Sequence, residues 1–538
     1  MNQVEVKKRQ IKSFSYIIGC IGILLLGKLL GNSGIAYLAA GYECYSFFFI
    51  LLGSNVPDAL GRMLKGRSAK GQYRNAARVR RYVMLFQVFL GIVGSVFLAL
   101  LGNFVIRKLF FMPRASYLPM VLVTAFFLRM VSAVLQGYLQ GEGDELPAAG
   151  ACLLRQILFV SLGFVFGNLL KGYGVKVGAL LGQEDFAAMY AAMGVAAAIG
   201  IAELLTGLFL VTACRISRRK AKNDAAEGMR ITDSFGRLVS ILYGNMLWGI
   251  LVQIFARIPI WLGIIFLQKR AAADLSVISS YGEYYGKYLA AGAVVVFFTD
   301  ILLISAASKV YVCLKRDEWN YAKTGFQGGL HLAAVQGLYF GAFLMAVSSQ
   351  LAGFLSGTTV GEATQNLATM IGNGAFTVCF LIVAGYFARL LILGKSQHLV
   401  VAGLGIMNVL FIISTVLFLN SGNMGVLSLV YAGLIASAAL CAVLGFFACK
   451  QLGMGIDWIQ TLVLPAGGAC ICGLISMFLG KALTPHLGNI TAILICFALS
   501  YLLYWILLIF LRNFREQELK MIPGGNLIKS FGKILQIY

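Results

Sequence analysis

Charged residues are scarce in this sequence: only 12% of its 538 residues are Asp, Glu, Lys or Arg, whereas 59% are hydrophobic. A soluble protein carries about 25% charged residues, so the composition excludes a soluble globular chain. The mean hydropathy of +0.84 agrees with this exclusion. The sequence therefore predicts a polytopic, all-α membrane protein.

Signatures of catalysis and of metal binding are also missing. The three histidines lie far apart, and the 11 cysteines form no CxxC pair. Cysteines in apolar spans are expected to act as small apolar residues. No phosphate-binding loop, GxSxG, HExxH or hydrolytic carboxylate pair occurs. We expect a transporter rather than an enzyme, with no catalytic residue, no metal site and no cofactor, and with Na⁺ or H⁺ left open as a coupling ion.

Acidic residues are outnumbered, with 21 Asp and Glu against 44 Lys and Arg. In a membrane protein such an excess reflects cytoplasmic loops and contact with anionic lipid rather than nucleic acid. The stretch 31–82 shows this most clearly, because an apolar half is followed by eight cations and no acid. The sequence thus predicts anionic membrane lipid as a partner and no nucleic acid.

Apolar windows predict fourteen transmembrane helices, since about 20 apolar residues cross a bilayer. They are expected at 11–31, 36–62, 82–106, 117–139, 147–170, 187–213, 236–267, 285–312, 325–353, 366–391, 397–419, 423–448, 460–482 and 489–511. With the N-terminus inside, the cytoplasmic segments hold 31 Lys and Arg and the outside segments hold 9. This distribution obeys the positive-inside rule and predicts that both termini are cytoplasmic.

A weak internal repeat divides these helices. The end of the second helix matches the end of the eighth in an aromatic residue followed by Asn and Ala, and the turns after the fourth and tenth helices match likewise. This pattern predicts two six-helix lobes in parallel repeat plus two C-terminal helices. The expected parts are an N-terminal lobe at 1–214, a cytoplasmic linker at 215–235, a C-terminal lobe at 236–450, and helices 13 and 14 with a tail at 451–538.

Ionisable residues at membrane depth are the candidates for function, because they are costly unless they face a cavity or a partner. Polar stripes at helical spacing follow the fourth helix (Arg129, Gln136, Gln140), the second (Glu43, Ser46, Ser54, Asp58) and the seventh (Gln253, Arg257). One interpretation is a hydrated, anion-attracting cavity. The other is structural ion pairing, Lys28 with Glu43 or Arg257 with Asp300. Arg389, at a helix end, is expected to be an anchor at the membrane surface.

Three stretches carry a family resemblance: GNSGIAYLAA, LGSNVPDALGRML with its basic tail, and LQGYLQGEGDELPAAGACLLRQI at 135–157. Together with the fourteen helices, they resemble the multidrug/oligosaccharidyl-lipid/polysaccharide exporter superfamily. Within it, the third stretch is similar to a turn of the branch that contains polysaccharide flippases, the stage V sporulation protein B group and lipid II flippases. The first helix has Lys28 and no acid, whereas the drug-efflux branch typically keeps an acid there.

This resemblance implies a flippase of undecaprenyl-pyrophosphate-linked oligosaccharides or cell-wall precursors that works by alternating access in the bacterial cytoplasmic membrane. Glycosyltransferases or a polymerase of the same pathway are the implied protein partners. A pyrophosphate needs fixed positive charge and sugars need amide partners, so the substrate-binding candidates are Lys28, Arg129, Arg155, Arg257, Gln136, Gln140 and Gln253. The alternative is cation-coupled multidrug efflux, with the ion-coupling candidates Glu43, Asp58 and Asp300.

Overall fold

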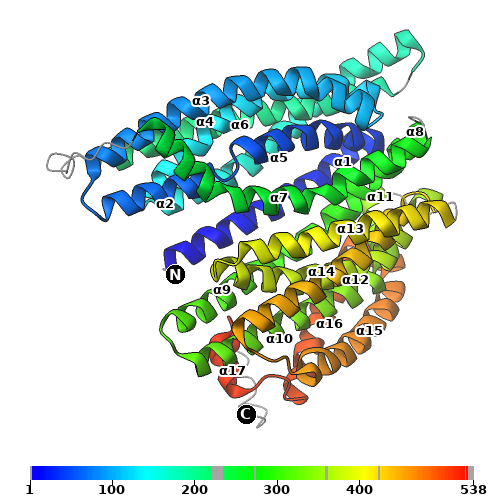
Figure 1. Ribbon diagram of the computed structural model, residues 1–538. Helices are drawn as coiled ribbons and strands as arrows, with labels where there is room; N and C mark the ends of the chain where they lie inside the picture. Colours follow the sequence, from blue (N-terminus) through cyan, green and yellow to red (C-terminus); the bar gives the residue numbers. More distant parts are fainter. Residues whose placement is uncertain are drawn as a thin grey trace. The chain divides into compact units, whose positions relative to one another are not determined.

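All secondary structure in the described residues of the computed structural model is helical (Figure 1). The described residues are 3–183, 185–220, 234–271, 274–357, 361–421, 424–526 and 529–530. The α-helices are α1 Gln3–Leu52, α2 Val56–Ser68, α3 Tyr73–Phe104, α4 Leu118–Gly141, α5 Glu145–Leu181, α6 Phe186–Lys220, α7 Phe235–Ala271, α8 Leu275–Glu283, α9 Ala290–Lys315, α10 Trp319–Ala346, α11 Ser348–Ser356, α12 Glu362–Leu393, α13 Gln397–Ser421, α14 Leu427–Leu452, α15 Leu464–Leu487, α16 Asn489–Phe510 and α17 Glu516–Met521.

Thirteen helical stretches within the described ranges are long and apolar enough to cross a membrane, and the first, Val4–Ser68, is 65 residues long. That length is about three times what one crossing needs. The helix breaks at Gly31, whose backbone is non-helical (φ 71°, ψ 173°). A Cβ on Gly27 would lie 3.9 Å from Ile35 Cγ1, whereas eight residues of straight helix span about 12 Å. The chain therefore turns back at Gly31, and the stretch Val4–Ser68 holds two crossings. With the other twelve of the thirteen stretches in the described residues, this gives fourteen crossings, and the predicted all-α fold with fourteen transmembrane helices is confirmed.

By its internal contacts the chain divides into two compact units, Ile18–Gly286 and a second unit of Met1–Ile17 with Lys287–Tyr538. In the first unit α5 packs on α6, α6 on α4, and α4 on both α3 and α2. α7 joins this unit through an apolar cluster that it shares with α2, α3 and α4. Most of the predicted linker, residues 221–233, lies outside the described residues, and the six-plus-six repeat stays a prediction.

Close contact between α5 and α6 depends on small residues. A Cβ on Gly194 of α6 would lie 2.3 Å from the carbonyl oxygen of Phe166 in α5 and 3.0 Å from Gly167 Cα. A Cβ on Gly174, further along α5, would lie 2.8 Å from the carbonyl oxygen of Phe186. The two backbones thus meet at two levels, as in small-residue packing between transmembrane helices.

We expect Gly194→Ala to lower the unfolding free energy by about 1–3 kcal/mol, because the new methyl group meets backbone atoms that cannot rotate away. Thermal unfolding of the purified protein in mild detergent measures the loss. The matched control is Gly172→Ala in α5, because the described residues place no other atom within 4 Å of its Cβ. Equal unfolding temperatures for the two variants would contradict this account of the α5–α6 contact.

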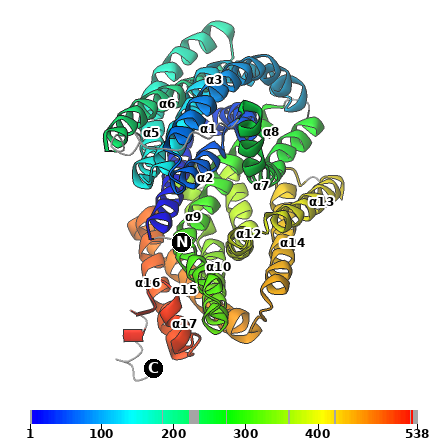
Figure 2. The same cartoon turned by 60° about the vertical axis from the view of Figure 1, so that its left-hand side comes forward.

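In the second unit α10 is the central helix, in contact with α9, α12 and α15, and α15 packs on α16 (Figures 1 and 2). Helix α17 also packs on α10. His331 Nδ1 lies 3.0 Å from Glu518 Oε2, and both side chains are buried. A Cβ on Gly328 would lie 3.2 Å from Glu518 Cβ. The segment after the fourteenth crossing is therefore a packed part of this unit.

Candidate functional site

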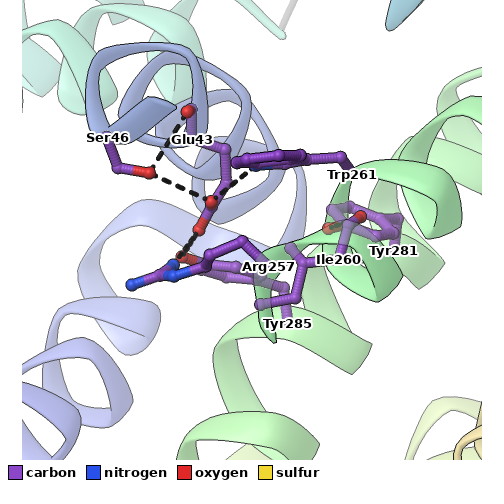
Figure 3. A network of polar contacts seen from close by, with 7 residues as sticks. All are labelled: Glu43, Ser46, Arg257, Ile260, Trp261, Tyr281 and Tyr285. Atoms are coloured by element: carbon purple, nitrogen blue, oxygen red, sulfur yellow. Dashed lines mark hydrogen bonds and ion pairs between the residues drawn. The ribbon is translucent and has the colours of Figure 1, made fainter. Parts of the chain in front are cut away.

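A buried polar network in the first unit surrounds the carboxylate of Glu43, whose side chain is fully buried (Figure 3). Arg257 Nη1 donates to Oε1 at 2.5 Å, and Tyr285 Oη donates to the same oxygen at 3.0 Å. Trp261 Nε1 donates to Oε2 at 3.0 Å, and Ser46 Oγ lies 3.3 Å from that oxygen. One charged and three neutral donors thus hold a carboxylate that would otherwise be costly to bury.

The donors come from three chain segments. Ser46 lies one turn after Glu43 on α1, while Arg257 and Trp261 lie four residues apart and therefore on the same face of α7. Tyr285 lies in a π-helical turn, Tyr284–Leu289, that follows α8 directly. A π-turn inserts one residue into a helix and so changes the direction of the side chains after it. This irregularity helps to aim Tyr285 at Glu43.

One feature holds α8 against α1, and another stabilises its first turn. A Cβ on Gly282 would lie only 1.8 Å from the carbonyl oxygen of Asn32, so the backbone of α8 lies directly against α1. At the start of α8, the Asp274 carboxylate accepts from the backbone N–H of Ser276 at 3.1 Å and caps the helix. Hydrogen bonds from that N–H and from the Ser276 hydroxyl lower the pKa of Asp274 below its ordinary value. Tyr285 therefore follows a helix that is capped at its start and packed against α1 near its end.

A second buried cluster lies between α4, α5 and α6. Glu203 Oε1 is 2.7 Å from Arg155 Nε and 3.6 Å from Arg129 Nη1. The exposed fractions of the side chains are 2% for Glu203, 10% for Arg155 and 20% for Arg129, and Arg129 also lies over the Phe49 ring at 5.0 Å. Arg129 and Arg155 both contact Glu203, so these three side chains together carry one net positive charge. This supports an anion-attracting interior.

A third cluster belongs to the second unit. Asp300 of α9 accepts from Arg389 Nε of α12 at 2.7 Å and from Ser13 Oγ of α1 at 2.7 Å. Gln10 Nε2 donates to the carbonyl oxygen of Ile301 at 3.2 Å. The cluster therefore also attaches the start of α1 to α9. Arg389 is an ion-pair partner of Asp300, and its expected position at the membrane surface stays a prediction.

The remaining predicted site residues differ in their surroundings. Gln253 Nε2 donates to Asn55 Oδ1 at 3.0 Å. Gln136 and Gln140 are buried, and a Cβ on Gly61 of α2 would lie 3.0 Å from Gln140 Cβ, so this part of α4 faces α2. The side chains of Lys28, on the first arm of α1, and of Asp58, on α2, are exposed. Their roles in binding or coupling stay predictions.

The contacts of three residues in these clusters were not predicted from the sequence: Trp261, Glu203 and Tyr285. Trp261 shares a face of α7 with Arg257, so the same periodicity that singled out Arg257 was a usable signal for it. Glu203 was noted as a membrane-depth acid but was not linked to Arg129 or Arg155. Tyr285 carried no usable signal, because its direction depends on the π-turn.

No family model matches the chain. It is 19% identical over 535 residues to stage V sporulation protein B of Bacillus subtilis (strain 168), with 94% of each chain covered. Its fold is similar to that of the lipid II flippase MurJ in an inward closed conformation, with a TM-score of 0.65, 14% identity, and 94% and 99% of the two chains covered. An inward-facing multidrug resistance MATE transporter of the MOP superfamily gives a TM-score of 0.62 at 14% identity, with 82% and 94% covered. The predicted resemblance to this superfamily and to its flippase branch is confirmed.

Proposed function

We propose that this protein is a flippase that moves an undecaprenyl-pyrophosphate-linked oligosaccharide or cell-wall precursor across the membrane by alternating access. The observation that carries the proposal is the similarity to stage V sporulation protein B, which extends over 94% of both chains. The fold shared with the lipid II flippase supports it. The cluster of Arg129, Arg155 and Glu203 adds the net positive charge that a pyrophosphate requires at membrane depth.

Multidrug efflux is the second candidate, because the fold is also similar to that of a MATE transporter at a TM-score of 0.62. An organic cation needs an acid whose charge is not already balanced by the protein. Two of the three coupling candidates do not meet this condition, since Glu43 is ion-paired with Arg257 and Asp300 with Arg389. The pairing of these acids counts against an organic cation as the substrate at Glu43 or Asp300.

The proposal places the protein in the bacterial cytoplasmic membrane with both termini inside, as the division of Lys and Arg between the loops supports. The proposed substrate ligands are Lys28, Arg129, Arg155 and Arg257, with glutamine side chains for the sugars. The step itself needs no cofactor, and Na⁺ or H⁺ would enter only as a coupling ion. A glycosyltransferase or polymerase of the same pathway would act on the two sides of this step.

A reconstituted transport assay tests the proposal. The protein is placed in vesicles of phosphatidylethanolamine and phosphatidylglycerol that contain a fluorescent undecaprenyl-pyrophosphate disaccharide, and a membrane-impermeant quencher reports which leaflet holds the label. We expect the protein to raise the rate of label exchange between leaflets well above that of protein-free vesicles. Parallel vesicles with an imposed pH or Na⁺ gradient and ethidium test efflux. Ethidium transport without any movement of the lipid would overturn the proposal and favour efflux.

A further inference from the structure

We propose that Glu43 is an internal counter-ion that competes with the phosphate oxygens of the lipid-linked substrate for Arg257. The inference rests on the proposed function and deepens it, since it assigns a regulatory role to a contact inside the candidate site. In the structure described here the pair is closed, with 2.5 Å between Arg257 Nη1 and Glu43 Oε1. Substrate binding would then be an exchange of one anion for another on the same guanidinium.

The two partners differ greatly in burial. The Glu43 side chain is fully buried, whereas 34% of the Arg257 side chain is exposed. The buried carboxylate has no access to water, whereas about a third of the Arg257 side chain is exposed, and a guanidinium fork carries five donors. Arg257 is therefore the partner that can turn towards an arriving anion, while Glu43 stays in place.

The Glu43 carboxylate also has hydrogen-bond donors that stay in place when Arg257 moves away. Without Arg257 its carboxylate would still accept from Trp261 at 3.0 Å and from Tyr285 at 3.0 Å, with Ser46 Oγ at 3.3 Å. Hydrogen bonds to a carboxylate are stronger than those between neutral groups and repay part of its desolvation. The three neutral donors thus reduce the cost of the state in which Arg257 has left.

The chemistry of the two anions gives this exchange a direction. A carboxylate carries one negative charge, whereas a pyrophosphate carries at least two and offers several oxygens to the planar guanidinium fork. A pyrophosphate can therefore displace Glu43, whereas a monovalent anion at ordinary concentration has little advantage over a carboxylate that is already in place. The pair would select for multiply charged headgroups and keep Arg257 neutralised between transport cycles.

The test measures the affinity of the detergent-solubilised full-length protein for farnesyl pyrophosphate by titration calorimetry. Glu43→Gln removes the competing charge and keeps the side-chain shape, so we expect it to bind at least about tenfold more tightly than the wild type. Tyr285→Phe removes one neutral donor and makes the release of Arg257 more costly, so we expect several-fold weaker binding. A purely structural role for the pair would not give changes of opposite sign in two folded variants.

Asp185→Asn is the matched control. Asp185 is also an acid of the first unit, accepts from an arginine, Arg114 at 2.5 Å, and from a tyrosine, Tyr37 at 2.5 Å, and its replacement changes the charge by the same amount. We expect its affinity to equal that of the wild type. Equal tightening in Asp185→Asn and Glu43→Gln, or no tightening in folded Glu43→Gln, would overturn the exchange. Should Glu43→Gln fail to fold, wild-type affinity in Tyr285→Phe would overturn it. Wild-type flipping in the vesicle assay would leave the proposed function standing in each of these cases.

Discussion

Replacing Glu203 by glutamine is expected to lower the unfolding free energy by about 3–5 kcal/mol, because the buried Arg155 guanidinium and the partly buried Arg129 guanidinium both lose the acid with which they are ion-paired. The carboxylate lies 2.7 Å from Arg155 Nε and 3.6 Å from Arg129 Nη1. Glutamine keeps the shape of the side chain but turns a cluster with one net positive charge into one with two. Chemical unfolding of the purified protein in mild detergent measures the loss.

Arg129→Gln is the control at the same cluster. It leaves Arg155 and Glu203 as a neutral pair, so we expect it to cost about 1 kcal/mol or less despite the loss of the contact with the Phe49 ring. Removing the shared acid is therefore expected to cost more stability than removing one of its two cations. Equal destabilisation by the two substitutions would mean that packing, rather than charge balance, determines the stability of the cluster.

The helices were predictable because apolar length and spacing determine which segments cross a membrane. The predicted helices at 397–419 and 489–511 correspond to α13 Gln397–Ser421 and α16 Asn489–Phe510. The predicted positions of helix ends were less accurate where a helix continues beyond its apolar part. Helix α3 begins at Tyr73 rather than at the predicted residue 82. The extra residues include Arg and Ala, which are good helix formers that a hydropathy window does not detect.

Backbone irregularities were not predictable from the same windows. The chain reversal at Gly31 needs a positive φ, which glycine adopts readily, but 62 glycines in the sequence gave no means of choosing this one. The π-turn at Tyr284–Leu289 likewise leaves no signal in a hydropathy window. Both features shape the Glu43 network, because the first positions α1 and the second aims Tyr285.

The charged residues of the candidate site were predicted, but their ion-pair partners were not. Glu43 and Arg257 are 214 residues apart in the sequence, and Asp300 and Arg389 are 89 apart. The cost of an isolated charge in lipid indicates that each residue needs a partner, but it does not say which one. The partner depends on which helix faces come together, and one sequence with only a weak internal repeat does not determine that.

Removing the cation of the Glu43 pair is expected to have the largest effect on transport. With Arg257→Gln we expect flipping of the undecaprenyl-pyrophosphate disaccharide to fall by about 10- to 100-fold, the value of a charge-assisted contact to phosphate. Arg257→Lys keeps the charge but loses the planar fork, so we expect it to lie between this variant and the wild type. The leaflet-exchange assay measures the rates, and protein recovered in the vesicles normalises them.

The double variant Glu43→Gln/Arg257→Gln separates binding from stability. Arg257→Gln alone leaves a fully buried carboxylate without its cation, and we expect it to lose about 2 kcal/mol of unfolding free energy, since three neutral donors remain. Removing both charges abolishes that penalty, so the double variant should regain most of the lost stability. It still lacks the guanidinium that binds phosphate, so flipping should stay low. If flipping recovered together with stability, Arg257 would serve only to neutralise Glu43, and the headgroup would have to be bound by other cations.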